Sequence, residues 1–205
     1  MSVAATTLLR PGLLEEVHLL LAGPSAPAPG EALSTAVASA CLGLGAQVST
    51  YVVDAEDEPT IDRAVADALA EAGALHILVV DGAGLFAHAL TRGDISHAAL
   101  RNCLDAAWNV TRAVVNRAFL PAERGGRIVY VAPAPDAGEH ADAAHAGLEN
   151  LARTLSVEWA RHGITVVTIA PGDTTAPGEV GALVAYLASL AGAYFSGCLL
   201  DLRGI

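Results

Sequence analysis

The stretch that decides the fold is residues 125–173, GGRIVYVAPAPDAGEHADAAHAGLENLARTLSVEWARHGITVVTIAPGD. Segment 127–131 follows two glycines and is short, apolar and β-branched, which is typical of a buried strand. Segment 164–169 has the same character, and Pro171 and Gly172 turn the chain directly after it. We therefore expect one buried strand near each end of the stretch.

A long helix is expected between these two strands, over 139–161. Its apolar residues recur at spacings of three and four, which places them on one face. They are Leu148, Leu151, Leu155 and Trp159. Gly163 marks the end of the helix. Strand, helix and strand at this spacing predict a βαβ unit of a parallel sheet.

The rest of the chain continues the same alternation. Strands are expected at 17–22, 47–54, 75–81 and 198–202, and helices at 31–42, 59–72, 95–120 and 180–190. Residues 1–12 are expected to be a tail, and 82–84 a glycine turn. The predicted fold is α/β, a single Rossmann-like doubly wound parallel sheet of about six strands, in one domain spanning 1–205.

Composition limits the class of protein and its partners. The chain has 205 residues, of which 53% are hydrophobic and 16% charged, so we expect a globular domain with an adequate core. The formal net charge of −11 disfavours nucleic acid and anionic membranes as partners. Lysine is absent, and all eleven cationic side chains are arginine.

Cysteine usage and the N-terminal sequence predict a cytoplasmic protein. Cys41, Cys103 and Cys198 are widely spaced and are expected to be buried free thiols. No charged segment precedes an apolar run at the N-terminus, so no signal peptide is expected. Segment 180–200 lacks charge and is long enough to span a bilayer, but its glycines favour a buried helix, a turn and a last strand.

Two segments of the deciding stretch resemble short-chain dehydrogenases/reductases. Residues 147–173 resemble the helix, strand and Pro-Gly turn that follow the active-site tyrosine of this family. Residues 125–131 resemble the strand that ends in its catalytic serine. The resemblance implies a dinucleotide-binding oxidoreductase fold. It also implies that this chain is shorter, without one βα unit after the second strand and without the substrate-loop helices after Gly172.

The resemblance places the family's TGxxxGxG cofactor loop just after the first strand. Ala22 and Gly23 match its opening, but Pro27 and Pro29 stand where the next glycines belong, and Gly30 comes one position late. Proline has no N–H group to offer a pyrophosphate and adds bulk where close approach is needed. We expect a rigid turn and no bound cofactor; a relaxed phosphate site that uses Gly30 and the next helix N-terminus remains the alternative.

The family's catalytic positions fall on other residue types in this chain. Its Tyr-x-x-x-Lys pair aligns with Ala141 and His145, and its serine with Ala132 or Pro133. Its asparagine aligns with Trp108, beside Asn109, and its Asn-Asn-Ala-Gly segment with 81–84, Asp-Gly-Ala-Gly. Because the chain has no lysine, no other register restores the pair. We therefore assign no catalytic, cofactor-binding or metal-binding residue.

A different chemistry at the same place is a second possibility. Asp136, Glu139, His140, Asp142 and His145 gather near the start of the helix at 139–161. Asp142 and His145, three residues apart, share a helix face and would suit an acid/base couple or a weak metal site. A solvated helix N-terminus, where the helix dipole favours acidic residues, explains the same pattern.

The two long helices, 95–120 and 139–161, predict an oligomer. In the family that the chain resembles, they form a contact between subunits. Apolar residues expected to exceed what one sheet face needs are Ala107, Trp108, Val115, Leu148, Ala152 and Trp159. The sequence thus predicts a non-catalytic pseudoenzyme, a structural or regulatory subunit of a heteromeric ketoreductase or 3-hydroxyacyl thioester dehydrogenase. The alternatives are an active NAD(P)-dependent oxidoreductase with a degenerate cofactor site, and a ligand-binding protein or redirected enzyme that uses Asp142 and His145.

Overall fold

A six-stranded parallel sheet forms the centre of the molecule in a computed structural model, which describes residues 9–25, 33–53, 58–93 and 96–204. The strand order is β2-β1-β3-β4-β5-β6, with every neighbouring pair parallel. The strands are β1 (His18–Gly23), β2 (Gln47–Val52), β3 (Ile77–Asp81), β4 (Gly126–Val131), β5 (Ile164–Ala170) and β6 (Leu199–Asp201).

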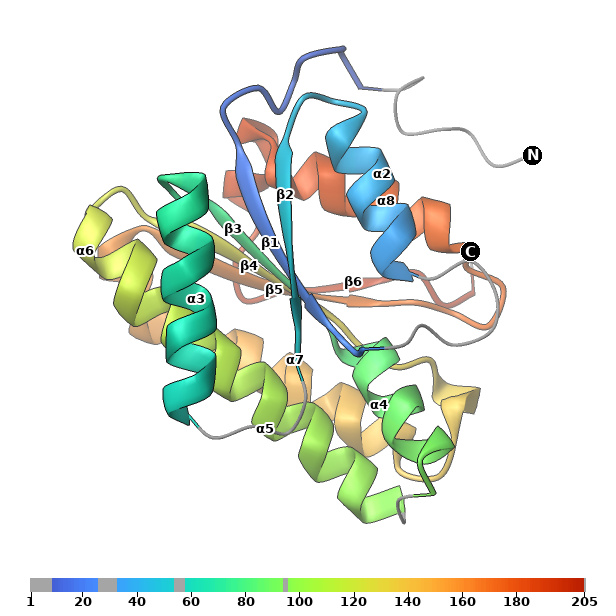
Figure 1. Ribbon diagram of the computed structural model, residues 1–205. Helices are drawn as coiled ribbons and strands as arrows, with labels where there is room; N and C mark the ends of the chain where they lie inside the picture. The colour runs from blue at the N-terminus through green and yellow to red at the C-terminus, as the bar shows by residue number, and fades with distance from the viewer. Residues whose placement is uncertain (1–8, 26–32, 54–57, 94–95, 205) are drawn as a thin grey trace.

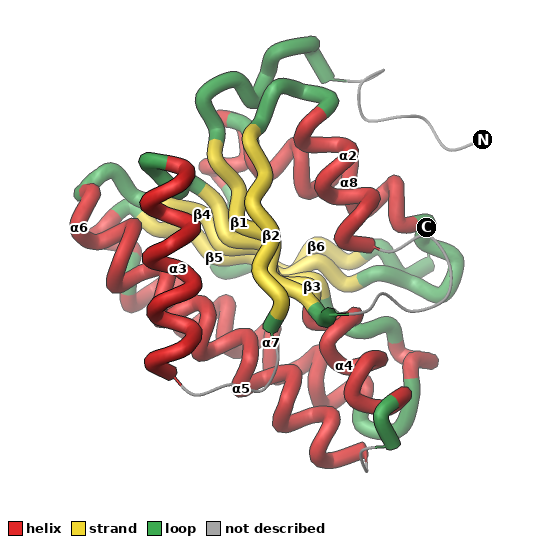
Figure 2. The backbone as a smooth tube through the Cα atoms, in the orientation of Figure 1, coloured by secondary structure: helices red, strands yellow, loops and turns green. Residues whose placement is uncertain are grey.

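Helices cover both faces of this sheet (Figure 1). One layer contains α3 (Glu58–Ala72), α5 (Ser96–Val114) and α7 (Ala141–Glu158). The other contains α2 (Leu33–Leu42) and α8 (Pro177–Ala188). Two further helices, α4 (Gly82–Thr91) and α6 (Leu120–Ala122), lie at opposite ends of the molecule, as Figure 2 shows. The arrangement is the three-layer α/β fold expected from the sequence.

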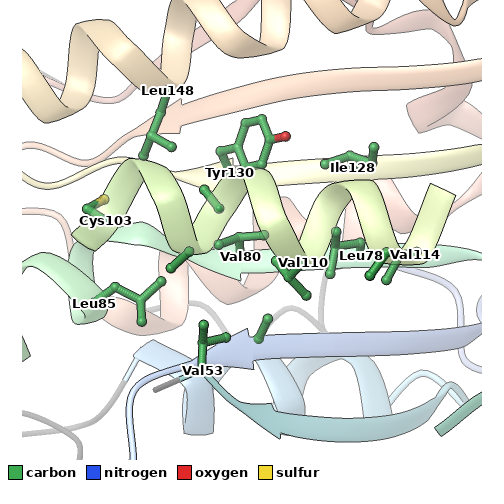
Figure 3. Packing of buried hydrophobic residues seen from close by; sticks show 14 of the residues in the cluster. Val53, Leu78, Val80, Leu85, Cys103, Val110, Val114, Ile128, Tyr130 and Leu148 are labelled. Carbon is green, nitrogen blue, oxygen red and sulfur yellow. The ribbon is translucent and has the colours of Figure 1, made fainter. Parts of the chain in front are cut away.

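Alternation along the strands divides the core into two layers. In β1, Leu20 packs with the cluster under α3, α5 and α7, whereas Leu19 and Leu21 pack with the cluster under α2 and α8. Every residue of β1 and β3 is buried, as is typical of strands covered on both faces. Figure 3 shows part of the first layer, where Val80, Val110 and Tyr130 meet between the sheet and α5.

One buried hydrogen bond crosses this apolar layer. Tyr130 of β4 is fully buried, and its hydroxyl lies 2.9 Å from the hydroxyl of Thr111 in α5. Burial raises the pKa of Tyr130 well above its usual range, so this phenol stays protonated. The bond fixes α5 over β4 and satisfies both polar groups.

The structure confirms the fold class and corrects several element boundaries. Residues 82–91 form a helix, where the sequence analysis expected only a glycine turn. The helix expected at 95–120 is α5, followed by a π-helical turn at Val115–Phe119 and then α6. The helix expected at 139–161 is shorter, because α7 ends at Glu158 and a 3-10 turn follows at Ala160–His162.

The sheet is shortened in the way the sequence predicted. Among the described residues, which omit 54–57, no strand lies between β2 and α3, and β2 forms one edge of the sheet. Residues 1–8 of the tail predicted at 1–12, the start of the first helix at 31–32 and the last residue of the strand expected at 47–54 lie outside the described residues. Segment 180–200 contributes to α8, a 3-10 turn and β6, and no helix among the described residues is long and apolar enough to cross a membrane.

Most of the residues expected to face a partner belong instead to the chain's own core. Those that are buried within the chain are Ala107, Val115, Leu148 and Ala152. Trp159 is partly buried against the same cluster, and Trp108 of α5 has 40% of its surface exposed. The apolar periodicity of α5 and α7 is therefore explained largely by the sheet that they cover.

Leu148→Ala tests this correction. Leu148 is fully buried, so the variant should lose about 2–5 kcal/mol of unfolding free energy through lost burial and a residual cavity. Val157→Ala is the matched control on the same helix, because Val157 is 78% exposed and should change stability by less than about 0.5 kcal/mol. Chemical denaturation measures both. If Leu148→Ala instead kept its stability but changed the oligomeric state, Leu148 would belong to a partner interface and not to the core.

Candidate functional site

The carboxyl edge of the sheet is where the chain brings its candidate residues together. β1 lies between β2 and β3 in the sheet. From β1 the chain continues to β2 on one side, and the later strands β3 to β6 follow in order on the other side. This switch point is the usual ligand crevice of an open parallel sheet. Gly23 ends β1 and Asp81 ends β3, and a Cβ on Gly23 would lie 3.4 Å from that of Asp81.

Asp81 is a buried carboxyl group at this switch point. Its Oδ1 accepts a hydrogen bond from the backbone N–H of Gly84 at 2.8 Å, and so it caps α4. A side chain at Gly84 would collide with the same carboxyl group. Burial raises the pKa of Asp81 to about 6, although the Gly84 hydrogen bond opposes that shift. The sequence analysis expected only a glycine turn at 82–84 and did not predict this cap.

Gly82 is enclosed by three elements just after Asp81. A Cβ at Gly82 would come within 2.7 Å of Leu148 Cδ1 and 2.8 Å of the Val131 carbonyl oxygen. The thiol of Cys103 donates to the carbonyl of Gly82 over 3.4 Å. Figure 3 shows Cys103 and Leu148 together at this end of α5. No side chain other than hydrogen fits here without displacing a strand or a helix.

The three cysteines have little nucleophilic character. Cys41 and Cys103 are fully buried, and burial raises the pKa of each thiol to about 12. Cys198 is only partly buried, contrary to the expectation that all three thiols are buried, although burial also raises its pKa.

The positions aligned with the serine and the tyrosine lie in a packed apolar cluster. Ala132 and Pro133, the two candidates for the serine position, follow β4, and Ala141 begins α7; all three are buried. Phe86 of α4 belongs to the same cluster. The intervening loop lies against α4, since a Cβ at Gly138 would be 2.8 Å from Leu90 Cδ1. At these positions the chain offers aliphatic groups and no exchangeable proton.

His145 is the buried polar group of α7. It has 6% of its surface exposed, and its Nε2 lies 3.8 Å from Oε2 of Glu149, one helical turn further on. Its Nδ1 has no hydrogen-bond partner among the described residues. Burial lowers the pKa of His145, Arg203 adds to that shift, and Glu149 opposes it. We conclude that His145 is neutral near pH 7.

The expected pairing of Asp142 with His145 is only partly supported. Asp142 is exposed and raises the pKa of His145 by a weak electrostatic effect, whereas the ion-pair contact of His145 is with Glu149. His140 is exposed, adopts a left-handed backbone with φ of 68°, and its Nε2 lies 4.0 Å from Oε1 of Glu139. Asp136 is exposed as well. The five residues do not converge.

A phosphate loop and a metal site were the remaining sites considered from the sequence. The residues proposed to disrupt a phosphate loop, Pro27 and Pro29, and the alternative Gly30 lie outside the described ranges. Among the residues that the structure does describe, no group of three or more His, Cys, Asp or Glu side chains is placed to hold a metal ion.

Comparison with known sequences finds one family. The family profile described as short chain dehydrogenase matches residues 25–180. The peroxisomal 2,4-dienoyl-CoA reductases of Pongo abelii and Rattus norvegicus are each 30% identical over 167 residues, which is 76% of this chain. The chain spans about half the length of these two reductases, because the matched region is 53% of each.

Comparison with solved structures finds the same fold. A citronellol catabolism dehydrogenase from Pseudomonas aeruginosa PAO1 superposes with a TM-score of 0.77 and 26% identity, covering 96% of this chain and 97% of that one. A short chain dehydrogenase from Mycobacterium smegmatis has a TM-score of 0.76 and 24% identity, with 94% of each chain covered.

Asp81→Asn tests the buried carboxyl group. Because the pKa of Asp81 is raised to about 6 in the fold, the folded protein is most stable when this carboxyl group is protonated, below about pH 4. It loses that stability as the pH rises through 6 and the group ionises. Asparagine keeps the acceptor for Gly84 without the charge. The variant should therefore be more stable than the parent by roughly 2–3 kcal/mol at about pH 8, and nearly equal to it at about pH 4.

Denaturant titrations at the two pH values measure this difference. Asp67→Asn, which changes an exposed carboxylate in α3, is the control and should have little effect at either pH. An Asp81→Asn variant that is less stable than the parent at about pH 8 would show that the charge itself is held favourably.

Proposed function

The chain belongs to the short chain dehydrogenase family, and we propose that it is a non-catalytic member that serves as a structural or regulatory subunit. One observation carries this proposal. The family's tyrosine aligns with Ala141 and its serine with Ala132 or Pro133, and all three residues are buried, Ala132 and Ala141 within the chain's own apolar core.

Proton exchange with a carbonyl substrate needs a group that this edge of the sheet lacks. In the family that the chain belongs to, a tyrosine transfers the proton and a lysine cation keeps its pKa low. Ala141 has no proton to give. His145 stands at the lysine position, but its lowered pKa leaves it uncharged near neutral pH. Both the proton donor and the neighbouring positive charge are thus missing from the aligned positions.

The proposed non-catalytic role requires no bound dinucleotide cofactor. Pro27 and Pro29 replace glycines of the phosphate loop, and proline offers neither an N–H group nor the close approach that a pyrophosphate needs. A carboxyl group at Asp81, facing the same switch point, adds negative charge when it ionises above about pH 6. Both features oppose the binding of a polyanionic cofactor.

The surface retained for a partner is the outer side of α5 and α7. The two helices pack closely, because a Cβ at Gly147 would lie only 2.8 Å from Leu104 Cδ1, and Figure 1 shows them side by side. Trp108 of α5 and Val157 of α7 are large apolar residues left 40% and 78% exposed. A partly exposed tryptophan is a typical anchor of a protein interface.

A catalytic member of the same family is the partner that this surface suits best. Two such chains would contribute equivalent helix pairs to one interface. The relatives with the highest identities reported above are named as reductases of a dienoyl-CoA, which favours a catalytic chain that acts on a CoA thioester. The proposed complex is thus a heteromeric ketoreductase or 3-hydroxyacyl thioester dehydrogenase in which this chain stabilises or regulates the active subunit.

Co-expression with a tagged catalytic relative tests the proposal. We expect a 1:1 complex by light scattering, with reductase activity that is lost when the relative's own tyrosine is replaced. This chain alone should show no reductase activity with NADH or NADPH. A chain that stays monomeric with every catalytic relative tried, or that reduces a carbonyl substrate by itself, would contradict the proposal.

Trp108→Glu locates the interface. A charge placed at a partly exposed aromatic anchor should weaken assembly by about tenfold or more, measured by the concentration dependence of the complex. Leu42→Glu is the matched control, because Leu42 is 55% exposed but lies at the end of α2 on the other face of the sheet. Equal weakening by both variants would argue against α5 and α7 as the contact.

A further inference from the structure

A groove lies at the amino edge of the sheet, opposite to the edge that carries Asp81 and Ala132. It consists of two adjoining cavities of about 540 and 640 Å³, which share Arg124, Gly125 and Gly163 as lining residues. The groove runs past the starts of β4 and β5, close to α6, whose position at one end of the molecule is clear in Figure 1. Volumes of this size match those of small-molecule sites.

Two glycine turns meet at the floor of this groove. Gly125 and Gly163 have φ values of +76° and +68°, in the region that glycine adopts most readily. A Cβ on Gly125 would lie only 2.4 Å from the carbonyl oxygen of Gly163, and one on Gly126 only 2.3 Å from Phe119 Cδ2. The two turns therefore pack directly against each other and Phe119 packs on Gly126, so these positions require glycine.

The rim carries arginines that have no carboxylate partner. Elsewhere in the described chain, the ion pairs of arginine involve Arg112, Arg117, Arg153 and Arg203. At the groove, Arg124, Arg127 and Arg161 lie within 4.0 Å of no carboxylate among the described residues. Three arginines thus line one groove without a direct carboxylate partner, in a chain whose net charge is −11.

The arginines differ in how far their donors are already used. Arg127 is partly buried, donates Nη1 to the carbonyl oxygen of Ala188 at the end of α8, and has its pKa lowered by burial. Arg161 donates Nε to Nε2 of His162. Arg124 is exposed and makes no hydrogen bond of this kind within the described ranges. The guanidinium group of Arg124 is thus the most available to a ligand.

A histidine and three glutamates also line the groove. The pKa of His76 is lowered, first by burial and then by Arg124, His18 and Arg127. Glu15, Glu16 and Glu123 also line the two cavities. The Glu15 side chain extends toward Gly12, since a Cβ there would lie 2.6 Å from its Oε1. These carboxylates leave the arginines unpaired at ion-pair distance.

We propose that this groove binds the phosphate or carboxylate group of a small organic anion. The planar guanidinium fork of arginine matches either oxyanion with two parallel hydrogen bonds. Arg124 and Arg127, which are three residues apart around the Gly125 turn, provide the charge, and the two cavities provide room for the anion. The site is independent of the proposed subunit role, because it uses the opposite edge of the sheet.

Calorimetric titration of the full chain at fixed ionic strength tests the site. Pyrophosphate and succinate are the two probes, and sodium chloride at equal ionic strength is the reference. Saturable binding of either probe supports the site, and the tighter one identifies the ligand as phosphate- or carboxylate-bearing. The absence of saturable binding of both probes at millimolar concentration would overturn the proposal.

Arg124→Gln assigns the binding to the groove. Removing one charge-assisted donor group should weaken the tighter probe about tenfold without loss of folding, because Arg124 is exposed. Arg124→Lys keeps the charge but loses the fork, and should fall between the parent and Arg124→Gln. Arg63→Gln, which removes an exposed arginine from α3, is the control. If Arg63→Gln weakened binding equally, the binding would depend on the overall charge of the protein and not on the groove, which would contradict the proposed site.

Discussion

The close packing around Gly82 is the constraint on which the rest of the molecule depends. At this glycine the end of β3 touches the carbonyl of Val131, the side chain of Leu148 and the thiol of Cys103. One position therefore sets the spacing of β3, β4, α5 and α7. Because protein interiors are close-packed, the helices cannot shift outward here without opening a void. The same contact places the start of α4 over the switch point, where Asp81 caps it.

This packing has a direct consequence for chemistry at the carboxyl edge. Ala132 and Ala141 pack into the cluster that Gly82 and Leu148 help to close, and the loop between them rests on α4. A side chain with a hydroxyl group at either position would have to find a hydrogen-bond partner among apolar neighbours. Under the proposed function, the fold keeps a six-stranded parallel sheet with its covering helices and uses the carboxyl edge of the sheet as part of its core.

Much of the fold follows from the sequence, and the parts that do not have physical reasons. Buried β-branched runs separated by helical periodicity predict the parallel sheet, and the short link between β2 and α3 predicts the shortened edge. The helix α4 was missed because Gly82 and Gly84 suggest a turn, while the capping carboxyl of Asp81 acts three residues ahead. Periodicity also cannot distinguish an apolar face that covers its own sheet from one that meets a partner, as Leu148 shows.

The candidate residues were harder to predict because their partners are set by tertiary structure. His145 can reach Asp142 or Glu149 by helical spacing alone, and the structure brings it nearest to Glu149. The groove at the amino edge joins Arg124 to Gly163, which are distant in sequence and meet only when β4 and β5 pair. No local pattern in the sequence marks such a site.

Titration of the purified chain with NADH and NADPH, followed by nucleotide fluorescence, tests the central claim most directly. If the chain is a non-catalytic member of its family, we expect no saturable change in fluorescence at millimolar nucleotide, because Pro27 and Pro29 stand in the phosphate loop. Saturable binding in the micromolar range would contradict that claim. It would show that the loop admits the pyrophosphate, and that the protein is to be assayed as an oxidoreductase in its own right.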